Sequence, residues 1–206
     1  MIVFKGFNSD LACTRGSGRF QYKIGETATA EEAQTAKCGL HSTKEPFEVL
    51  RYYSNLEKDR FCICEAAGDI NEDGDHRVSS TKLTPIKEIT PQELAIYEAV
   101  WIEKHPSLPY SPEVCKEEGT DNGYFTVVRG KDPRGKAVTV GTVIILLQEY
   151  KTRKDIKAAA VYQIETVKDK GWYQIGGKCE KGYSAKIKDA PGDSRDRKKS
   201  KRGSAV

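Results

Sequence analysis

Cys38 and His41 lie close together in the segment KCGLHST, with Gly39 between them. A thiol beside an imidazole can serve nucleophilic catalysis, but the two groups must lie within about 3–4 Å and a third group must orient the histidine. This spacing on a turn seldom gives that geometry, and no partner Asn or Asp is evident. The segment favours an architectural role, in which Gly39 adopts a positive φ, His41 bonds the turn and Cys38 packs as a small hydrophobic residue.

A zinc site is the sharper alternative for the same cysteine and histidine. A set of three cysteines and one histidine could combine Cys13, Cys38, His41 and either Cys62 or Cys64. The spacing differs from that of common zinc knuckles, and Cys62 and Cys64 share one face of an expected strand. We therefore expect no zinc.

The segment DINEDGD offers the ligand types of a calcium loop. Asp69, Asn71, Asp73 and Asp75 occupy its first four ligand positions. The twelfth position is Ser80 where a bidentate glutamate is needed, and the flanking segments have the pattern of strands. An acidic turn is the favoured interpretation, so we expect neither a metal nor another cofactor.

The positive charge of the chain is concentrated at its C-terminal end. Residues 186–206 carry eight lysines and arginines against three aspartates, while the whole chain has a formal charge of +4. A cluster of six cations there could contact phosphates or an acidic partner: Arg195, Arg197, Lys198, Lys199, Lys201 and Arg202. No aromatic residue is interleaved with them, so we expect a solvated tail or nonspecific contact with nucleic acid.

The composition is that of an ordinary folded chain. Its 206 residues are 37% hydrophobic and 31% charged, with a mean hydropathy of −0.62. The longest apolar run, VGTVIILL, is far shorter than the roughly 20 residues of a membrane span. No secretory signal is visible, so the six cysteines are expected to be reduced thiols in the cytoplasm.

One helix has clear end signals, in the segment TPQELAIYEAVWIEKH. Thr90 can cap it and Glu93 can complete a capping box. Leu94, Tyr97 and Trp101 share a face at helical spacing, so Trp101 is expected to be buried against the sheets. A shorter helix is expected in STKEPFEVLRYYSNL, capped by Ser42 or Thr43.

The other elements are expected to be short strands, which gives an α+β fold. We predict an N-terminal mixed module with short helices over residues 1–104, in which the capped helix covers 90–104. A Pro-rich connection follows over 105–122. A β-rich module over 123–181, an antiparallel meander, and a basic tail over 182–206 complete the chain.

The ordered segments FKGFNSDLAC, FQYKIGE, CGLHSTKEPFEVLRYY, RFCICEAAGDI and SSTKLTPIKEITPQEL resemble an uncharacterised domain family carried by phages and prophages. The resemblance covers about residues 3–97. It includes Lys5, Gly6, Phe7, Cys13, Phe20, Tyr22, Gly25, Cys38, Gly39, His41, Pro46 and Glu65. It implies a phage or prophage origin, and no activity is established for the family.

The order of motifs is also similar to that of ADP-ribosyltransferase-like folds. By that analogy Lys5, His41, Ser42, Tyr52 and Glu65 would line a nucleotide pocket. Lys5 stands where such enzymes carry a histidine or arginine, which argues against activity.

We therefore predict a phage or prophage accessory protein that acts as a non-enzymatic binding module, with counter-defence as one form of that role. Its partner would be a host or phage protein or a ribonucleoprotein in the cytoplasm of an infected or lysogenic cell, with no membrane involved. A transferase-like enzyme and a virion-associated structural protein are the alternatives. The enzyme would need a cleft lined by the five residues named above.

Overall fold

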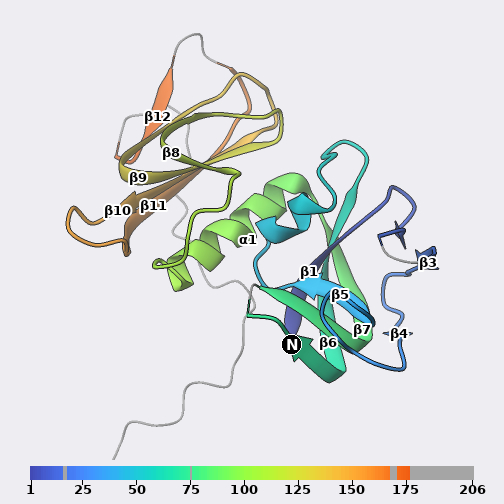
Figure 1. The fold of residues 1–206 in the computed structure, drawn as a ribbon. Coiled ribbons are helices and arrows are strands. Elements are labelled where there is room, and N and C mark those ends of the chain that lie inside the picture. Colours follow the sequence, from blue (N-terminus) through green and yellow to red (C-terminus); the bar gives the residue numbers. More distant parts are fainter. Residues whose placement is uncertain (16–17, 75, 168–170, 177–206) are drawn as a thin grey trace, which may run out of the picture.

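The computed structural model describes residues 1–15, 18–74, 76–167 and 171–176, and these ranges are built mainly from β-strands (Figure 1). They contain one α-helix, α1, and one 3₁₀ helix, η1. The expected α+β fold with several short helices is therefore wrong. The end signals located the one long helix, but between the other turns the chain forms strands or irregular segments.

The N-terminal sheet has the strand order β4-β7-β5-β1-β6, and β6 also pairs with β7, so that four strands close a ring. A separate two-stranded sheet, β2 with β3, flanks it. The strands are β1 (Ile2–Phe7), β2 (Ala12–Cys13), β3 (Phe20–Gln21), β4 (Ala28–Thr29), β5 (Leu40–Thr43), β6 (Arg60–Glu72) and β7 (Arg77–Ile89).

The two faces of β6 pack into two different hydrophobic cores. Side chains alternate between the faces of a strand, so Phe61 and Ile63 pack with one core while Cys62, Cys64 and Ala66 pack with another. Because both faces are covered here, the start of the strand is almost uniformly apolar. The strand predicted from RFCICEAAGDI is confirmed, and it continues to Glu72.

The short helix that was expected after position 42 forms as η1 (Phe47–Arg51), a 3₁₀ helix preceded by Pro46. Its predicted caps are wrong, because Ser42 and Thr43 belong to β5 and pair with β7. Only five residues remain for the helix, which is the length range in which 3₁₀ geometry is common.

The predicted capped helix is confirmed as α1 (Pro91–Lys104), and Thr90 and Glu93 form the capping box. Its buried face is not the expected one, since it consists of Leu94, Ala95, Glu98, Ala99 and Ile102. Trp101 is only half-buried, and its ring stacks on His105 with centroids 3.8 Å apart. The expected burial of Trp101 is therefore wrong, because the buried face of α1 is formed by residues smaller than tryptophan.

The C-terminal sheet is mixed, with the strand order β11-β10-β9-β12 and β8 paired to β9. Both β8 with β9 and β9 with β10 are parallel, so the expected antiparallel meander is wrong. The strands are β8 (Val114–Thr120), β9 (Phe125–Lys136), β10 (Val143–Glu149), β11 (Ile156–Gln163) and β12 (Trp172–Gln174).

Two features of this sheet could not be anticipated from apolar patterns. The second half of β9 leaves β10 and pairs with β12, so the chain from Lys131 to Thr142 serves as the long crossover that parallel strands require. In addition, β8 lies inside the segment that was expected to be a Pro-rich loop. The basic tail lies outside the described residues.

One apolar core joins the two sheets through α1, which lies between them in Figure 1. Phe47 of η1 stacks on Phe125 of β9 with ring centroids 5.1 Å apart. The described part of the chain has no helix that is long and apolar enough to cross a membrane.

Candidate ligand-binding cavity

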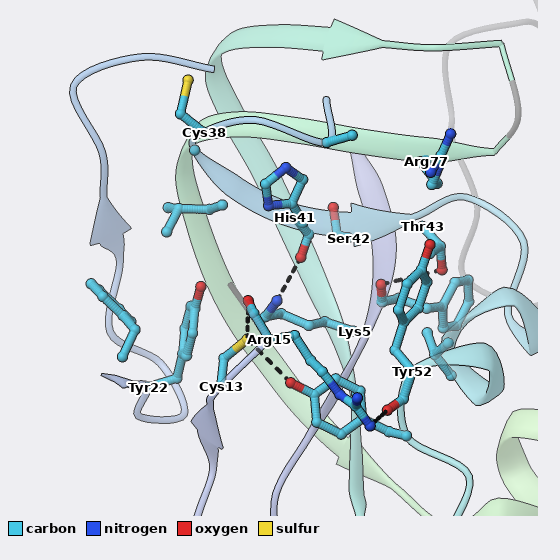
Figure 2. Close-up of a pocket in the computed structure, with 18 of the residues that line it drawn as sticks. Lys5, Cys13, Arg15, Tyr22, Cys38, His41, Ser42, Thr43, Tyr52 and Arg77 are labelled. Atoms are coloured by element: carbon cyan, nitrogen blue, oxygen red, sulfur yellow. Dashed lines mark hydrogen bonds between the residues drawn. The ribbon is translucent and has the colours of Figure 1, made fainter. Parts of the chain in front are cut away.

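A cavity of about 600 Å³ opens where β1 and β5 meet. The two strands share a single register pair, Phe4 with Thr43. Side chains of both strands, of the loops on either side of β3, and of Tyr52 and Tyr53 line the space (Figure 2). The cavity thus opens where two neighbouring strands share a single pair of facing residues.

Lys5 forms the buried end of this cavity. Its side chain is on the same face of β1 as Val3 and Phe7, and the residue is only 6% exposed. Its Nζ donates to the backbone oxygen of His41 over 2.6 Å and lies 5.3 Å from the centre of the Tyr22 ring. Burial lowers the pKa of Lys5, because the charged form is poorly solvated there.

Four further cations line the cavity: Arg15, Arg19, Lys37 and Arg77. Two of them have acidic partners, since Arg19 pairs with Asp10 and Arg77 with Asp73. Among the described residues, however, no aspartate or glutamate lines the cavity itself. The lining therefore has one sign of charge and favours anions.

Cys13 lies beside Lys5 at the wall of the cavity. The hydroxyl of Tyr53 donates to its sulfur over 3.1 Å, and the guanidinium of Arg15 lies 5.7 Å from the centre of the Tyr53 ring. Burial alone would raise the pKa of the Cys13 thiol. The charge of Lys5, the bond from Tyr53 and the Arg15 segment outweigh burial and hold the pKa below its ordinary value.

The segment KCGLHST forms the opposite wall. Gly39 has a φ of +93°, and a Cβ on it would lie 2.3 Å from the hydroxyl of Ser79, so the predicted positive φ is confirmed. Cys38 does not pack as a small hydrophobic residue, because it is half-exposed and its sulfur lies 3.9 Å from a Glu32 carboxylate oxygen. The ring of His41 bonds the backbone of Gln34, while its Nε2 has no partner among the described residues.

Four of the five residues proposed for a transferase pocket line the cavity, namely Lys5, His41, Ser42 and Tyr52. Glu65 does not, because it is exposed on β6. The hydroxyl of Ser42 is buried without a hydrogen-bond partner among the described residues.

Sequence reasoning did not identify the pair of Cys13 and Tyr53. The two residues are 40 positions apart, and nothing in the sequence indicates that β2 meets the end of η1. The cationic lining was also missed, because its members are scattered over loops and β7.

The residues considered for zinc separate into two groups. Cys13, Cys38 and His41 line the cavity, whereas Cys62 and Cys64 lie buried in the core beneath it. Burial raises the pKa of Cys62 to about 12 and also raises the pKa of Cys64. Zinc binds thiolates, so these two thiols are poor ligands. Within the described residues, no group of three or more His, Cys, Asp or Glu side chains is placed to hold a metal.

The acidic segment considered for calcium forms the end of the hairpin of β6 and β7. Asp69 and Asn71 belong to β6, and the Asn71 carboxamide oxygen accepts from the backbone of Thr35. Asp73 pairs with Arg77. Asp75 lies outside the described residues, as do the six cations of the tail.

Residues 1–97 match a family model with the description "Domain of unknown function (DUF7666)". The match agrees with the resemblance to an uncharacterised domain, and it carries no information on origin or activity. No curated protein and no solved structure matches the chain significantly.

Proposed function

We propose that residues 1–97 form a non-enzymatic binding module that holds a nucleotide in the cavity, either free or as part of an RNA. The observation that carries this proposal is the burial of Lys5 in a cavity whose described lining contains no carboxylate. The proposal concerns what the cavity recognises, and it assigns no reaction to it.

A buried cation without a carboxylate beside it is costly, because its charge has lost solvation without a fully ionised acidic partner. The ammonium of Lys5 has three N–H donors, and its hydrogen bond among the described residues is the one to His41. A phosphate could accept from the other donors. Charge-assisted bonds of that kind are about twice as strong as neutral ones.

Aromatic rings near the mouth of the cavity could hold the flat part of such a ligand. Phe20 lines the cavity although it is 42% exposed, and its ring lies against Tyr22 with centroids 4.8 Å apart. Tyr52 is half-buried on the other side. Stacking of a base on such a ring contributes about 1–3 kcal/mol.

The arrangement favours binding over transfer. Orientation of a ribose for transfer would need the carboxylate of Glu65 in the cavity, and this residue points elsewhere. The transferase alternative would therefore need an acid that the described lining does not provide.

The origin, partner and cellular location of the protein are proposed from the family resemblance. They are a phage or prophage origin, a host or phage protein or ribonucleoprotein as partner, and action in the cytoplasm, with counter-defence as one form. From the positive charge of the tail we also propose nonspecific contact with nucleic acid, and a virion-associated structural role is the alternative.

Calorimetry tests the binding proposal with three probes: AMP, NAD and a short single-stranded RNA with a 5′ phosphate. We expect micromolar affinity for at least one of them, at least 10-fold weaker binding by Lys5→Met, and weaker binding in high salt. Lys157→Met is the matched control, since Lys157 is an exposed lysine of β11.

The AMP and RNA arms separate a free nucleotide from one within RNA. Absence of heat with all three probes, or equal binding by wild type and Lys5→Met, would contradict the proposal.

A further inference from the structure

The cavity also contains a thiol that the binding proposal leaves without a role. We propose that Cys13 is a nucleophile that captures an anionic electrophile in this cavity and forms a thioether with it. The preference for an anion rests on the same cations as the proposed function, whereas the nucleophilic thiolate does not require that any nucleotide binds.

Geometry supports a thiolate at Cys13. The Tyr53 hydroxyl donates to its sulfur over 3.1 Å, and a hydroxyl donor stabilises a sulfur anion. Lys5 lies close enough for its charge to lower the pKa of Cys13. Figure 2 shows Cys13, Lys5 and Arg15 gathered on one side of the cavity.

The Cys13 sulfur is accessible to small molecules as well as close to cations. Cys13 is half-exposed and lines a cavity of about 600 Å³, so a small molecule can reach its sulfur. Independently, Ser42 also lines the cavity, is only 5% exposed, and has a hydroxyl without a partner among the described residues. An unpaired polar group in a cavity wall needs an explanation, and a polar ligand in the cavity is the one that we propose.

Cys38 provides an internal comparison on the opposite wall (Figure 2). Its thiol lies 3.9 Å from a Glu32 carboxylate oxygen, and that carboxylate repels an anionic reagent. The two cysteines share one cavity but differ in their contacts, since Cys13 accepts from the Tyr53 hydroxyl and Cys38 lies beside the Glu32 carboxylate.

The reaction is a simple displacement. The lone pair of the Cys13 sulfur forms a bond to the electrophilic carbon, and the leaving group departs with the electrons of its own bond to that carbon. With iodoacetate the products are the carboxymethyl thioether and iodide. Lys5 and Arg15, whose charges act on the Cys13 thiol, would attract the carboxylate of the reagent.

The test compares iodoacetate, which is anionic, with iodoacetamide, which is neutral and of similar size. The folded full-length chain is alkylated at pH values from about 5.5 to 9, and peptide mass mapping gives a rate for each cysteine. For Cys13 we expect a midpoint of the pH–rate profile below the ordinary thiol value of about 8.5. We also expect the ratio of iodoacetate to iodoacetamide rates to be at least 10-fold higher at Cys13 than at Cys38.

Lys5→Met should raise the midpoint of the pH–rate profile of Cys13 and lower its ratio of iodoacetate to iodoacetamide rates, because it removes a cation that acts on the thiol. Lys157→Met should change neither. A Cys13 midpoint at or above about 8.5, or equal rate ratios at Cys13 and Cys38, would overturn the inference. A failure of the nucleotide proposal looks different, since calorimetry would then show no heat while Cys13 still reacts at low pH.

Discussion

The N-terminal and C-terminal sheets each bury a cation, Lys5 and Arg129, and the two cations have different kinds of partner. Arg129 of β9 is 1% exposed, and three hydrogen bonds hold it within the protein. It donates to Glu149 over 2.8 Å, to the backbone oxygen of Pro106 over 2.6 Å, and to that of Lys154 over 3.0 Å. Lys5 faces a cavity and bonds one backbone oxygen.

This difference distinguishes a structural charge from one available to a ligand. The bonds of Arg129 connect β9 to β10, to the segment before β8 and to the loop before β11, and the ring of Tyr110 lies 4.5 Å from its guanidinium. No carboxylate lines the described cavity around Lys5, and its hydrogen bond goes to a neutral backbone oxygen. A ligand can therefore stabilise the N-terminal site in a way that has no counterpart in the C-terminal sheet.

The largest expected effect comes from exchanging each cation for methionine. Arg129→Met should lower the free energy of unfolding by about 3–5 kcal/mol, because it removes the cation paired with Glu149 and the donor to two carbonyl groups. Lys5→Met should be neutral or stabilising by about 1–2 kcal/mol, because it removes a desolvated charge. Urea denaturation of both variants measures this contrast, and equal destabilisation would mean that Lys5 is structural too.

The second prediction concerns a buried carboxyl group that lies between the two sheets. Glu98 of α1 is 1% exposed, and one of its oxygens accepts from the backbone of Phe47 over 3.0 Å. Burial and the charge of Glu45 raise the pKa of Glu98 to about 8, from an ordinary value of 4.5. The folded protein therefore holds this proton over a pH range in which the unfolded chain has lost it.

Stability should consequently fall as the pH rises from about 4.5 to about 8, by up to about 1.4 kcal/mol per pH unit from this group. Below that range both states are protonated and the contribution is fully present. Glu98→Gln keeps an oxygen for Phe47 and cannot ionise, so its unfolding free energy should lack this decline. Parallel pH dependence in wild type and variant would contradict the assignment.

A smaller effect is expected at the wall of the cavity. His41→Ala removes the ring bond to the backbone of Gln34 and should lower the free energy of unfolding by about 1–2 kcal/mol. Its backbone oxygen still accepts from Lys5, so nucleotide binding should change less than in Lys5→Met. A folded His41→Ala protein that binds no nucleotide would instead give the ring a direct role.

The smallest effect concerns Cys38. Cys38→Ser should change the free energy of unfolding by less than about 0.5 kcal/mol, because the side chain is half-exposed and packs in no core. Thermal melting measures the change. Loss of more than about 1 kcal/mol would show that the thiol has a structural partner.

Local signals predicted what depends on neighbouring residues. The capping box of Thr90 and Glu93 and the strand beginning at Arg60 follow from sequence because their causes lie within a few positions. The parallel pairing of β9 with β10 does not, since an apolar strand pattern is the same for either direction.

The residues that line the cavity could likewise not be predicted from local sequence signals alone. Lys5, His41, Ser42 and Tyr52 could be singled out by their motifs, but the absence of Glu65 from the lining depends on which face of β6 this one residue occupies. A slip of one residue along a strand reverses every side chain, so a site that draws on several strands cannot be fixed from patterns alone.

The most direct test of the account is a crystal structure of the protein soaked with AMP. We predict the phosphate in the cavity with one oxygen about 2.7–2.9 Å from Lys5 Nζ, the distance of a charge-assisted hydrogen bond. A structure in which AMP lies outside the cavity while Lys5 still bonds only the backbone of His41 would contradict the central claim.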